Sequence, residues 1–275
     1  MPGAAMSGGE LRAENLSKTY RAKGQAPVRV LDNCSLAVAA GRLTVLMGPS
    51  GSGKSTLAYI LAGYVAPDRG RVLLDGAAVE KPGPNRLMVF QETTLWPWMT
   101  VADNVLFGPS VRTAGAKAEA RAKARDLLQR FGLLDFQDKF PGQLSGGMKR
   151  RAEIAQALIN EPRVLIMDEP FRGLDVMTRE LMQEYYLKVF EESRPTTLFI
   201  TSEIEEAIFL ADVILFMDPK LGRVGRAIEV DLPRPRTFEI MASARYREIK
   251  EQALETLYAH EESEHYSPQQ TPMGG

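Results

Sequence analysis

The chain has 275 residues, of which 44% are apolar and 25% charged, and its formal net charge is -1. This balance is typical of a globular protein and argues against a strongly basic surface for nucleic acid or anionic lipid. The single cysteine, Cys34, can form no disulfide within the chain, which fits a reducing compartment. Residues 1–10 lack the features of a signal peptide, and we find no run of about 20 uncharged residues, so we expect any membrane role to require a partner.

The predicted elements follow a clear order along the chain. Alternating residues at 11–40 and 70–90, with turns such as Asp75-Gly76 and Pro82-Gly83, predict a small antiparallel sheet. Short apolar runs predict buried strands of a mostly parallel sheet covered by helices. These runs are 43–47, 164–167, 197–201 and 213–217.

Two stretches are predicted to be helical. Residues 92–160 are mostly helix, and acidic residues interrupt the basic ones at 114–130, so we interpret that part as a solvated amphipathic helix and expect no nucleic-acid partner. Apolar residues from Ile249 to Leu257 follow helical spacing before a polar tail, 261–275, that we expect to be disordered. The fold class is therefore α/β, with an antiparallel β subdomain and an inserted helical subdomain.

A glycine-rich motif, GxxxxGK[ST], directly follows the predicted strand 43–47. Glycines let backbone N–H groups turn toward phosphate oxygens, and the next helix presents its positive end to the same anion. The lysine then faces the β- and γ-phosphates, and the serine hydroxyl faces Mg²⁺. The predicted nucleotide site consists of Gly48, Pro49, Ser50, Gly51, Ser52, Gly53, Lys54, Ser55 and Thr56.

Two adjacent carboxylates, Asp168 and Glu169, end the predicted strand 164–167. At the carboxyl edge of the sheet, Asp168 would lie beside Mg²⁺ near the phosphate loop, and Glu169 could polarise an attacking water. Taken alone, an apolar run followed by two acids is as often a buried strand with acidic ends as it is a catalytic motif. Further residues are needed to choose the family.

The segment Leu144-Ser145-Gly146-Gly147-Met148 resembles the LSGGQ signature of ABC ATPases, and its distance upstream of Asp168 is also similar to that family. The resemblance spans about residues 11–235 and implies an ABC ATPase core of the phosphate-loop NTPase class. Ser145 and the N–H groups of Gly146 and Gly147 would form a second anion site at a helix start. In the family, this site closes over the ATP held by a second, head-to-tail subunit, in a homodimer or heterodimer.

The resemblance also implies roles for three single residues. Tyr20 matches the aromatic residue that stacks on adenine, although an aromatic side chain near a strand end is commonly just packing. Gln91 matches the glutamine that contacts Mg²⁺ and senses the transmembrane partner, and Asp175 in Gly173-Leu174-Asp175 matches a contact across the dimer. Trp96 and Trp98 could belong to the core or to a groove that receives a helix of that partner.

The domain organisation follows from these matches. We expect a flexible N-terminus at 1–10, an ABC ATPase domain at 11–235 with its helical subdomain at about 92–160, and a C-terminal helical extension with a disordered tail at 236–275. Met148, which replaces the usual glutamine, and the segments 205–212 and 231–236 resemble the ATPases of nitrate, sulfonate, taurine and bicarbonate importers. That subgroup implies ATP and Mg²⁺ as cofactors, transmembrane permease subunits, an extracytoplasmic substrate-binding protein, and a location on the cytoplasmic face of the membrane.

One position departs from the family pattern. After the predicted strand 197–201 the family has a histidine that contacts the γ-phosphate, whereas this chain has Ser202. The histidines of the chain, His260 and His265, lie near its C-terminal end. Serine donates a hydrogen bond but carries no positive charge, so hydrolysis is expected to be weaker unless another group compensates.

Several functions stay open at this point. The leading one is an importer subunit that hydrolyses ATP with Glu169, Lys54, Gln91 and Ser202 as catalytic residues and Ser55, Gln91 and Asp168 as Mg²⁺ ligands. An alternative is a degenerate ATP-binding or regulatory subunit paired with an active ABC ATPase, and an exporter or lipid-transport ATPase is another. A soluble ABC ATPase of DNA repair or translation is disfavoured, because the chain has no long coiled coil and no basic excess.

Overall fold

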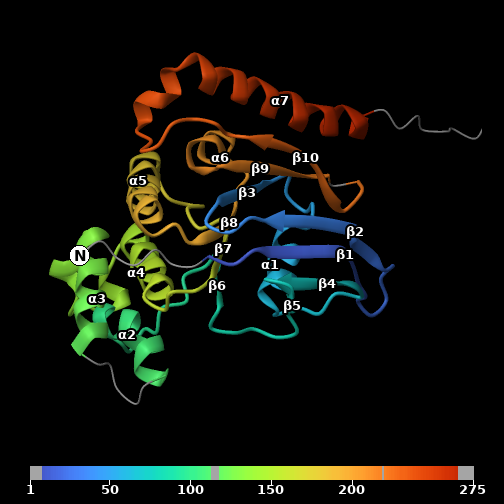
Figure 1. Cartoon of the computed structure of the whole chain (residues 1–275). Helices are drawn as coiled ribbons and strands as arrows, with labels where there is room; N and C mark the ends of the chain where they lie inside the picture. The colour runs from blue at the N-terminus through green and yellow to red at the C-terminus, as the bar shows by residue number, and fades with distance from the viewer. Residues whose placement is uncertain (1–7, 113–117, 219, 266–275) are drawn as a thin grey trace, which may run out of the picture.

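The computed structural model describes residues 8–112, 118–218 and 220–265. Its larger sheet contains β3 (Leu43–Met47), β6 (Arg86–Val89), β7 (Val164–Asp168), β8 (Thr196–Ile200), β9 (Val213–Asp218) and β10 (Arg223–Glu229). The strand order is β10-β9-β3-β8-β7-β6 (Figure 1). All neighbours pair in parallel except β10, which is antiparallel to β9 at one edge.

The four predicted parallel strands are confirmed to within one residue at each end. Every residue of β3, β7 and β8 is buried, as expected for strands covered on both faces. The edge strand β10 was not predicted, because most of its residues are exposed and it carries no apolar run.

The smaller sheet is antiparallel and contains β1 (Leu11–Tyr20), β2 (Val28–Val38), β4 (Arg69–Leu74) and β5 (Ala77–Ala78) in the order β2-β1-β4-β5. The expectation that all of 70–90 joins this sheet is wrong for its last part. Strand β6 pairs in parallel with β7 instead, with Met88 opposite Ile166. A four-residue strand is too short for its periodicity to reveal which sheet it joins.

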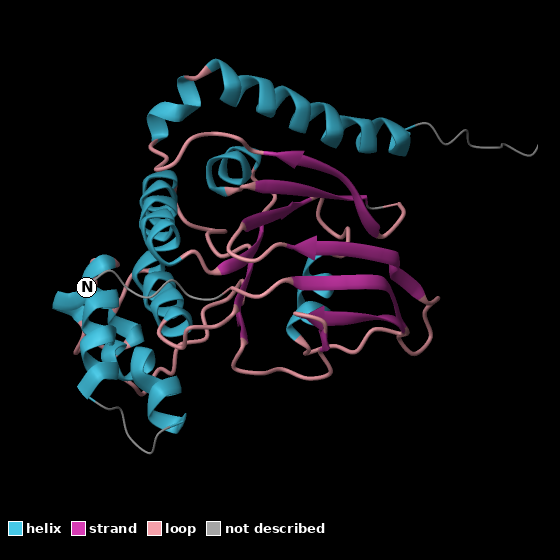
Figure 2. Cartoon of the chain, in the orientation of Figure 1, coloured by secondary structure: helices cyan, strands magenta, loops and turns pink. Residues whose placement is uncertain are grey.

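Helix α1 (Lys54–Ala62) lies between the two sheets and carries the phosphate loop at its start (Figure 2). Its Leu57 and Leu61 are buried in one core with Leu16 of β1 and Ile166 of β7. This packing fixes the direction of the helix, and therefore the position of the loop at the carboxyl end of β3.

On the opposite face of the parallel sheet, Met167 and Phe199 are buried in one core with Phe190 of α5 and Ile208 of α6. The helical elements between β6 and β9 are α2 (Val101–Arg112), α3 (Ala118–Arg130), η1 (Leu134–Phe136), η2 (Pro141–Gln143), α4 (Gly146–Leu158), α5 (Val176–Ser193) and α6 (Ile204–Leu210). Helices α2, α3 and α4 gather at one end of the molecule, away from the smaller sheet (Figure 1). Residues 92–160 are therefore mostly helical, as predicted.

The C-terminal part consists of η3 (Phe238–Ala242) and the long helix α7 (Ala244–His265), which lies along the β9–β10 side of the molecule (Figure 1). The side chains of Ile249 and Ala253 are buried against the main core. The helix runs past Glu261 to His265, so the first part of the predicted disordered tail is helical; 266–275 lie outside the described residues. Most of the predicted flexible N-terminus, residues 1–7, also lies outside them.

Two arginines join this C-terminal part to the core. Arg236 is buried, and its guanidinium donates to the carbonyl oxygens of Phe209 at 3.0 Å and Ala211 at 2.6 Å, where α6 ends. Arg234 pairs with Asp212 at 2.9 Å and with Glu191 at 3.3 Å. The two guanidinium groups thus donate hydrogen bonds to carbonyl oxygens at the buried end of α6, which have no partner within the helix. Among the described residues, no helix is long and apolar enough to cross a membrane.

Candidate active site

The phosphate loop connects β3 to α1 and is shaped by its glycines. Gly51 and Gly53 have φ angles of 81° and 99°, which most side chains disfavour, and Gly53 caps α1. The ammonium of Lys54 is buried and donates to the carbonyl oxygens of Gly48 at 2.7 Å and Pro49 at 2.8 Å. Burial lowers the pKa of Lys54, while the nearby Glu169 and Asp168 raise it. The loop therefore holds a cation within a ring of backbone groups.

The carboxyl ends of three neighbouring strands bring the predicted catalytic groups together. Strand β8 lies between β3 and β7, so that Ile200 pairs with Leu46 on one side and with Asp168 on the other. The phosphate loop, the two acids and Ser202 each follow one of these strands. The sheet edge therefore gathers residues that are up to about 150 positions apart in the sequence.

Asp168 offers an oxygen suited to Mg²⁺. Its side chain is buried, and its Oδ1 has no hydrogen-bond partner among the described residues. Burial raises its pKa and Glu169 adds to this, whereas the Ser55 hydroxyl and Lys54 oppose it. A buried carboxylate with one unpartnered oxygen beside a hydroxyl is a donor set of hard oxygens, which Mg²⁺ prefers. The residues fit the metal, although no cluster of three or more His, Cys, Asp or Glu forms a metal site within the described residues.

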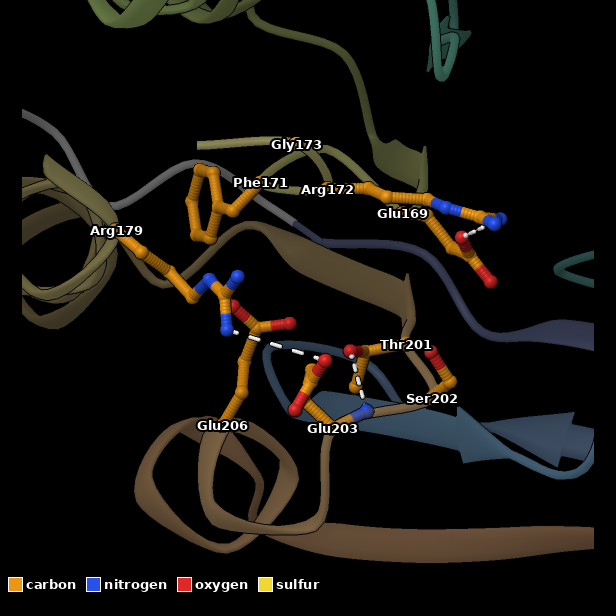
Figure 3. Close-up of a pocket in the computed structure, with 9 residues that line it drawn as sticks. All are labelled: Glu169, Phe171, Arg172, Gly173, Arg179, Thr201, Ser202, Glu203 and Glu206. Carbon is orange, nitrogen blue, oxygen red and sulfur yellow. Dashed lines mark hydrogen bonds and ion pairs between the residues drawn. The ribbon is translucent and has the colours of Figure 1, made fainter. Parts of the chain in front are cut away.

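Glu169 comes directly after β7 with a φ of 44°, and its backbone N–H donates to the carbonyl of Ile200. A left-handed conformation is unusual for glutamate and turns the side chain out of the strand direction. The carboxylate then pairs with Arg172, whose Nη1 lies 2.7 Å from Oε2 (Figure 3). Sequence reasoning missed Arg172; the only signal was a basic residue three positions after a proposed base.

Ser202 lies in a cavity of about 170 Å³ together with Glu169 and Arg172 (Figure 3). Arg179 and Glu203 line the other side of the cavity and face each other at 3.9 Å, and the Thr201 hydroxyl accepts from the Glu203 N–H. The described residues that line this cavity include no histidine. The histidine that the family has after β8 is therefore not replaced by another histidine among these lining residues.

The signature-like residues begin helix α4. The Ser145 hydroxyl caps that helix by accepting from the N–H of Met148 at 3.3 Å. Gly147 packs so closely on α5 that a Cβ there would lie 2.5 Å from a methyl of Thr178. Ser145 and Gly146 are exposed, so the start of the helix is open to an anion or to another subunit.

Asp175 lies beside this helix start and caps α5. Its Oδ1 accepts from the N–H of Thr178 at 3.0 Å and its Oδ2 accepts from the Thr178 hydroxyl at 2.6 Å. These bonds lower the pKa of Asp175. The residue thus has a role within its own chain, and its predicted contact across a dimer stays a prediction.

Gln91 is exposed, and a buried ion pair on α4 holds its backbone. Arg150 donates to the carbonyl oxygens of Phe90 and Gln91, and its partner Glu153 accepts from the N–H and hydroxyl of Thr94 at 3.1 and 2.8 Å. Sequence reasoning did not identify this pair. The pair links α4, the helix of the signature, to the segment that carries Gln91. The predicted contact of the Gln91 amide with Mg²⁺ stays a prediction.

The aromatic side chains of Tyr20, Trp96 and Trp98, which the sequence singles out, are all exposed. Tyr20, the last residue of β1, is 43% exposed, with the Lys18 ammonium 5.7 Å from its ring centre, and is accessible for stacking. Trp98 is 66% exposed, and its ring lies 5.3 Å from that of Trp96, which in turn lies 5.5 Å from Phe107. Of the two alternatives for the tryptophans, the structure favours a surface cluster over the core.

Comparisons with known proteins agree with this geometry. Residues 31–172 match the model of the ABC transporter family. The chain is 42% identical over 252 residues to the bicarbonate transport ATP-binding protein CmpD of Synechocystis, covering 90% of this chain and 89% of the relative. It is 39% identical to the nitrate import ATP-binding protein NrtD of Synechococcus elongatus, covering 93% and 94%, and 40% identical to the taurine import ATP-binding protein TauB of Pseudomonas syringae, covering 87% and 93%.

A solved structure adds the fold. The dimeric post-hydrolysis structure of the ATP-binding cassette MJ0796, bound to ADP and Pi, superposes with a TM-score of 0.71 at 30% identity and covers 81% of this chain and 100% of its own. The near-full-length relatives, the fold, and the position of the phosphate loop and carboxylates at one edge of the sheet thus indicate the same family. This chain belongs to the ABC transporter family, as an ATP-binding subunit whose ATP hydrolysis is coupled to transmembrane transport.

Proposed function

We propose that this chain powers an importer of a small anion or of a nitrogen or sulfur compound, at the cytoplasmic face of the membrane. Two copies bind MgATP between them, head to tail, and a pair of permease subunits converts their closure and opening into transport. An extracytoplasmic protein delivers the substrate. The support for import is the set of near-full-length relatives named for bicarbonate, nitrate and taurine.

The observation that carries the hydrolytic site is the charge arrangement around Lys54. A buried ammonium inside the phosphate loop, a buried carboxylate with an unpartnered oxygen and a second carboxylate that lines the cavity lie at one edge of the sheet. These groups match the needs of phosphoryl transfer, which are cations at the phosphates, an oxygen ligand for Mg²⁺ and an acceptor for the proton of water.

Each residue then has a defined task. Lys54 and the backbone N–H groups of the phosphate loop bind the phosphates, and Tyr20 stacks on the adenine. Ser55, Asp168 and Gln91 would hold Mg²⁺, which would supply positive charge to the phosphate oxygens. Glu169 accepts a proton from water as the water oxygen bonds to the γ-phosphorus and the bond to the ADP oxygen breaks. Ser202 donates a hydrogen bond to the γ-phosphate. The products are ADP and phosphate.

The second anion site belongs to the partner's nucleotide in this proposal. Ser145, Gly146 and Gly147 at the exposed start of α4 face the γ-phosphate held by the other copy, and Asp175 lies at the same interface. A subunit that binds ATP but hydrolyses it only beside a complete partner is the second candidate, favoured by the serine at position 202.

Steady-state ATP hydrolysis across protein concentration tests the proposal, with Glu169→Gln as the control. A rate per subunit that rises with concentration and is lost in the variant supports an active homodimer. Tight MgATP binding with no turnover at any concentration supports the second candidate instead.

The exposed Trp96–Trp98 cluster is the proposed docking place for the permease. A cavity of about 260 Å³ lies near it, with Leu87, Val89 and Phe107 on its apolar side and Glu153, Gln156 and Asn160 among its polar lining residues. Trp98→Ala is expected to weaken co-purification of the permease while ATP hydrolysis by the isolated chain is unchanged. Equal recovery of the permease by the variant would contradict this assignment.

A further inference from the structure

The site lacks a cation where the family has a histidine. Charge accumulates on the transferring phosphoryl group and on the attacking water, and a cation fixed beside them lowers the barrier. Ser202 is neutral, and no histidine is among the described residues that line its cavity. Two arginines line that cavity, so they are the candidates for supplying the missing charge.

Arg179 lies on the other side of the cavity from Glu169. It leaves α5, donates to the Leu174 carbonyl at 3.2 Å and faces Glu203, the residue before α6, at 3.9 Å (Figure 3). Arg172, in contrast, points to the proposed base. Its guanidinium binds the Glu169 carboxylate at 2.7 Å, and its backbone N–H donates to the Glu169 carbonyl at 3.1 Å.

The exposures of this pair suit a working site. The Glu169 side chain is only 11% exposed, whereas that of Arg172 is 59% exposed and reaches in from solvent. The ion pair uses Oε2 of the carboxylate, which leaves Oε1 to accept from a water (Figure 3). The field of Arg172 also reaches the phosphate loop, because it is one of the charges that lower the pKa of Lys54.

We propose that Arg172 is a positioning residue that fixes the Glu169 carboxylate and supplies, at the mouth of the site, the positive charge that Ser202 cannot provide. The inference rests on the proposed role of Glu169 as the base. Arginine stays protonated throughout, so it takes no part in proton transfer. Because it acts after ATP is bound, it affects turnover and leaves ATP affinity nearly unchanged.

The test compares Arg172→Ala, Arg172→Gln and Arg172→Lys with wild type and with Arg226→Gln, an exposed arginine on β10. We expect kcat to fall about tenfold or more for Ala and Gln, with KM for ATP within about twofold, and to recover largely for Lys. The inference would be overturned if Arg172→Gln kept the wild-type kcat or had a higher one. It would also be overturned if only the KM for ATP rose, or if the wild-type chain showed no turnover.

A double variant makes the test sharper. If Arg172 fills the role of the missing histidine, Ser202→His should add little to wild type but restore much of the kcat lost in Arg172→Ala. Equal effects of Ser202→His in both backgrounds would contradict this coupling. Glu169→Gln distinguishes a failure of the proposed base from a failure of the role of Arg172. Activity in Glu169→Gln refutes the proposed base. An inactive Glu169→Gln together with a fully active Arg172→Ala refutes only the role of Arg172.

Discussion

The carboxylate of Glu153 and the guanidinium of Arg150 form an ion pair at 2.6 Å that is almost completely buried, with side chains 4% and 5% exposed. Both residues also bind the chain between Phe90 and Thr94, so each side chain of the pair has partners besides the other. Helix α4, which is capped by the signature serine Ser145, is thereby tied to the segment of Gln91. These polar contacts add to the apolar packing of Leu95 in the core that also contains Ile154 of α4.

Breaking this pair on one side is expected to be costly. Glu153→Gln leaves the Arg150 charge buried without a counter-ion, and we expect the free energy of unfolding to fall by about 3–5 kcal/mol. Denaturant unfolding followed by circular dichroism measures this. Arg245→Gln, which breaks exposed ion pairs with Asp231 and Glu248, should leave the free energy of unfolding nearly unchanged, and a similar loss in both variants would contradict the argument.

Glu206 makes stability depend on pH in a defined direction. The side chain is buried and accepts from the Gln183 amide at 2.9 Å, and burial raises its pKa above the ordinary value of 4.5. The folded state therefore binds the proton more tightly than the unfolded state, so this stabilisation is present below pH 4.5 and lost as pH rises through the higher folded pKa.

Glu206→Gln should remove that dependence. Comparison of unfolding curves for the variant and wild type between pH 4 and pH 8 should give a stability difference that shifts in favour of the variant as pH rises. Glu251→Gln, on the exposed face of α7, serves as the matched control. A difference that is constant with pH would contradict the raised pKa.

Arg236 is expected to stabilise the C-terminal part through its hydrogen bonds to the end of α6. Arg236→Met leaves the carbonyls of Phe209 and Ala211 without these donors, and we expect a loss of roughly 2–4 kcal/mol. Arg236→Lys should recover little, because an ammonium lacks the planar fork. Arg223→Gln, exposed on β10, should be neutral in the same unfolding measurement.

Mixing two inactive variants tests the head-to-tail dimer directly. Lys54→Ala destroys the phosphate loop and Ser145→Ala the signature, so each homodimer has two damaged sites. In a mixed dimer, one site contains both substitutions, and the other site contains the unchanged Lys54 of one chain and the unchanged Ser145 of the other. Random mixing should then restore about a quarter of the wild-type rate, since half of the dimers are mixed and each has one working site.

The same experiment has a clear contrary outcome. If Lys54 and Ser145 of one chain acted on the same nucleotide, no pairing would restore an intact site and the mixture would stay inactive. Because Ser145 also caps α4, the stability of Ser145→Ala needs a separate measurement, with an expected loss of about 1 kcal/mol.

The phosphate loop and the buried strands were predictable from sequence because their signals are local. Glycines at Gly51 and Gly53 permit positive φ angles, and continuous apolar runs such as 164–167 indicate strands buried on both faces. The rule that parallel strands end at one edge then places Asp168 near Lys54 without knowledge of any contact. Family, fold class and the main chemical groups therefore follow from short stretches of sequence.

Other features depend on packing between distant segments, and only the tertiary structure decided them. The short strand β6 joins the parallel sheet because Met88 meets Ile166, which no local pattern indicates. Arg150 reaches Phe90 and Gln91 across about 60 residues, and Arg236 reaches the end of α6. Even the pair of Arg172 with Glu169, close in sequence, depends on the left-handed turn at Glu169. Side-chain pairing of this kind is set by distance and burial in the folded chain, and these quantities are absent from the order of the residues.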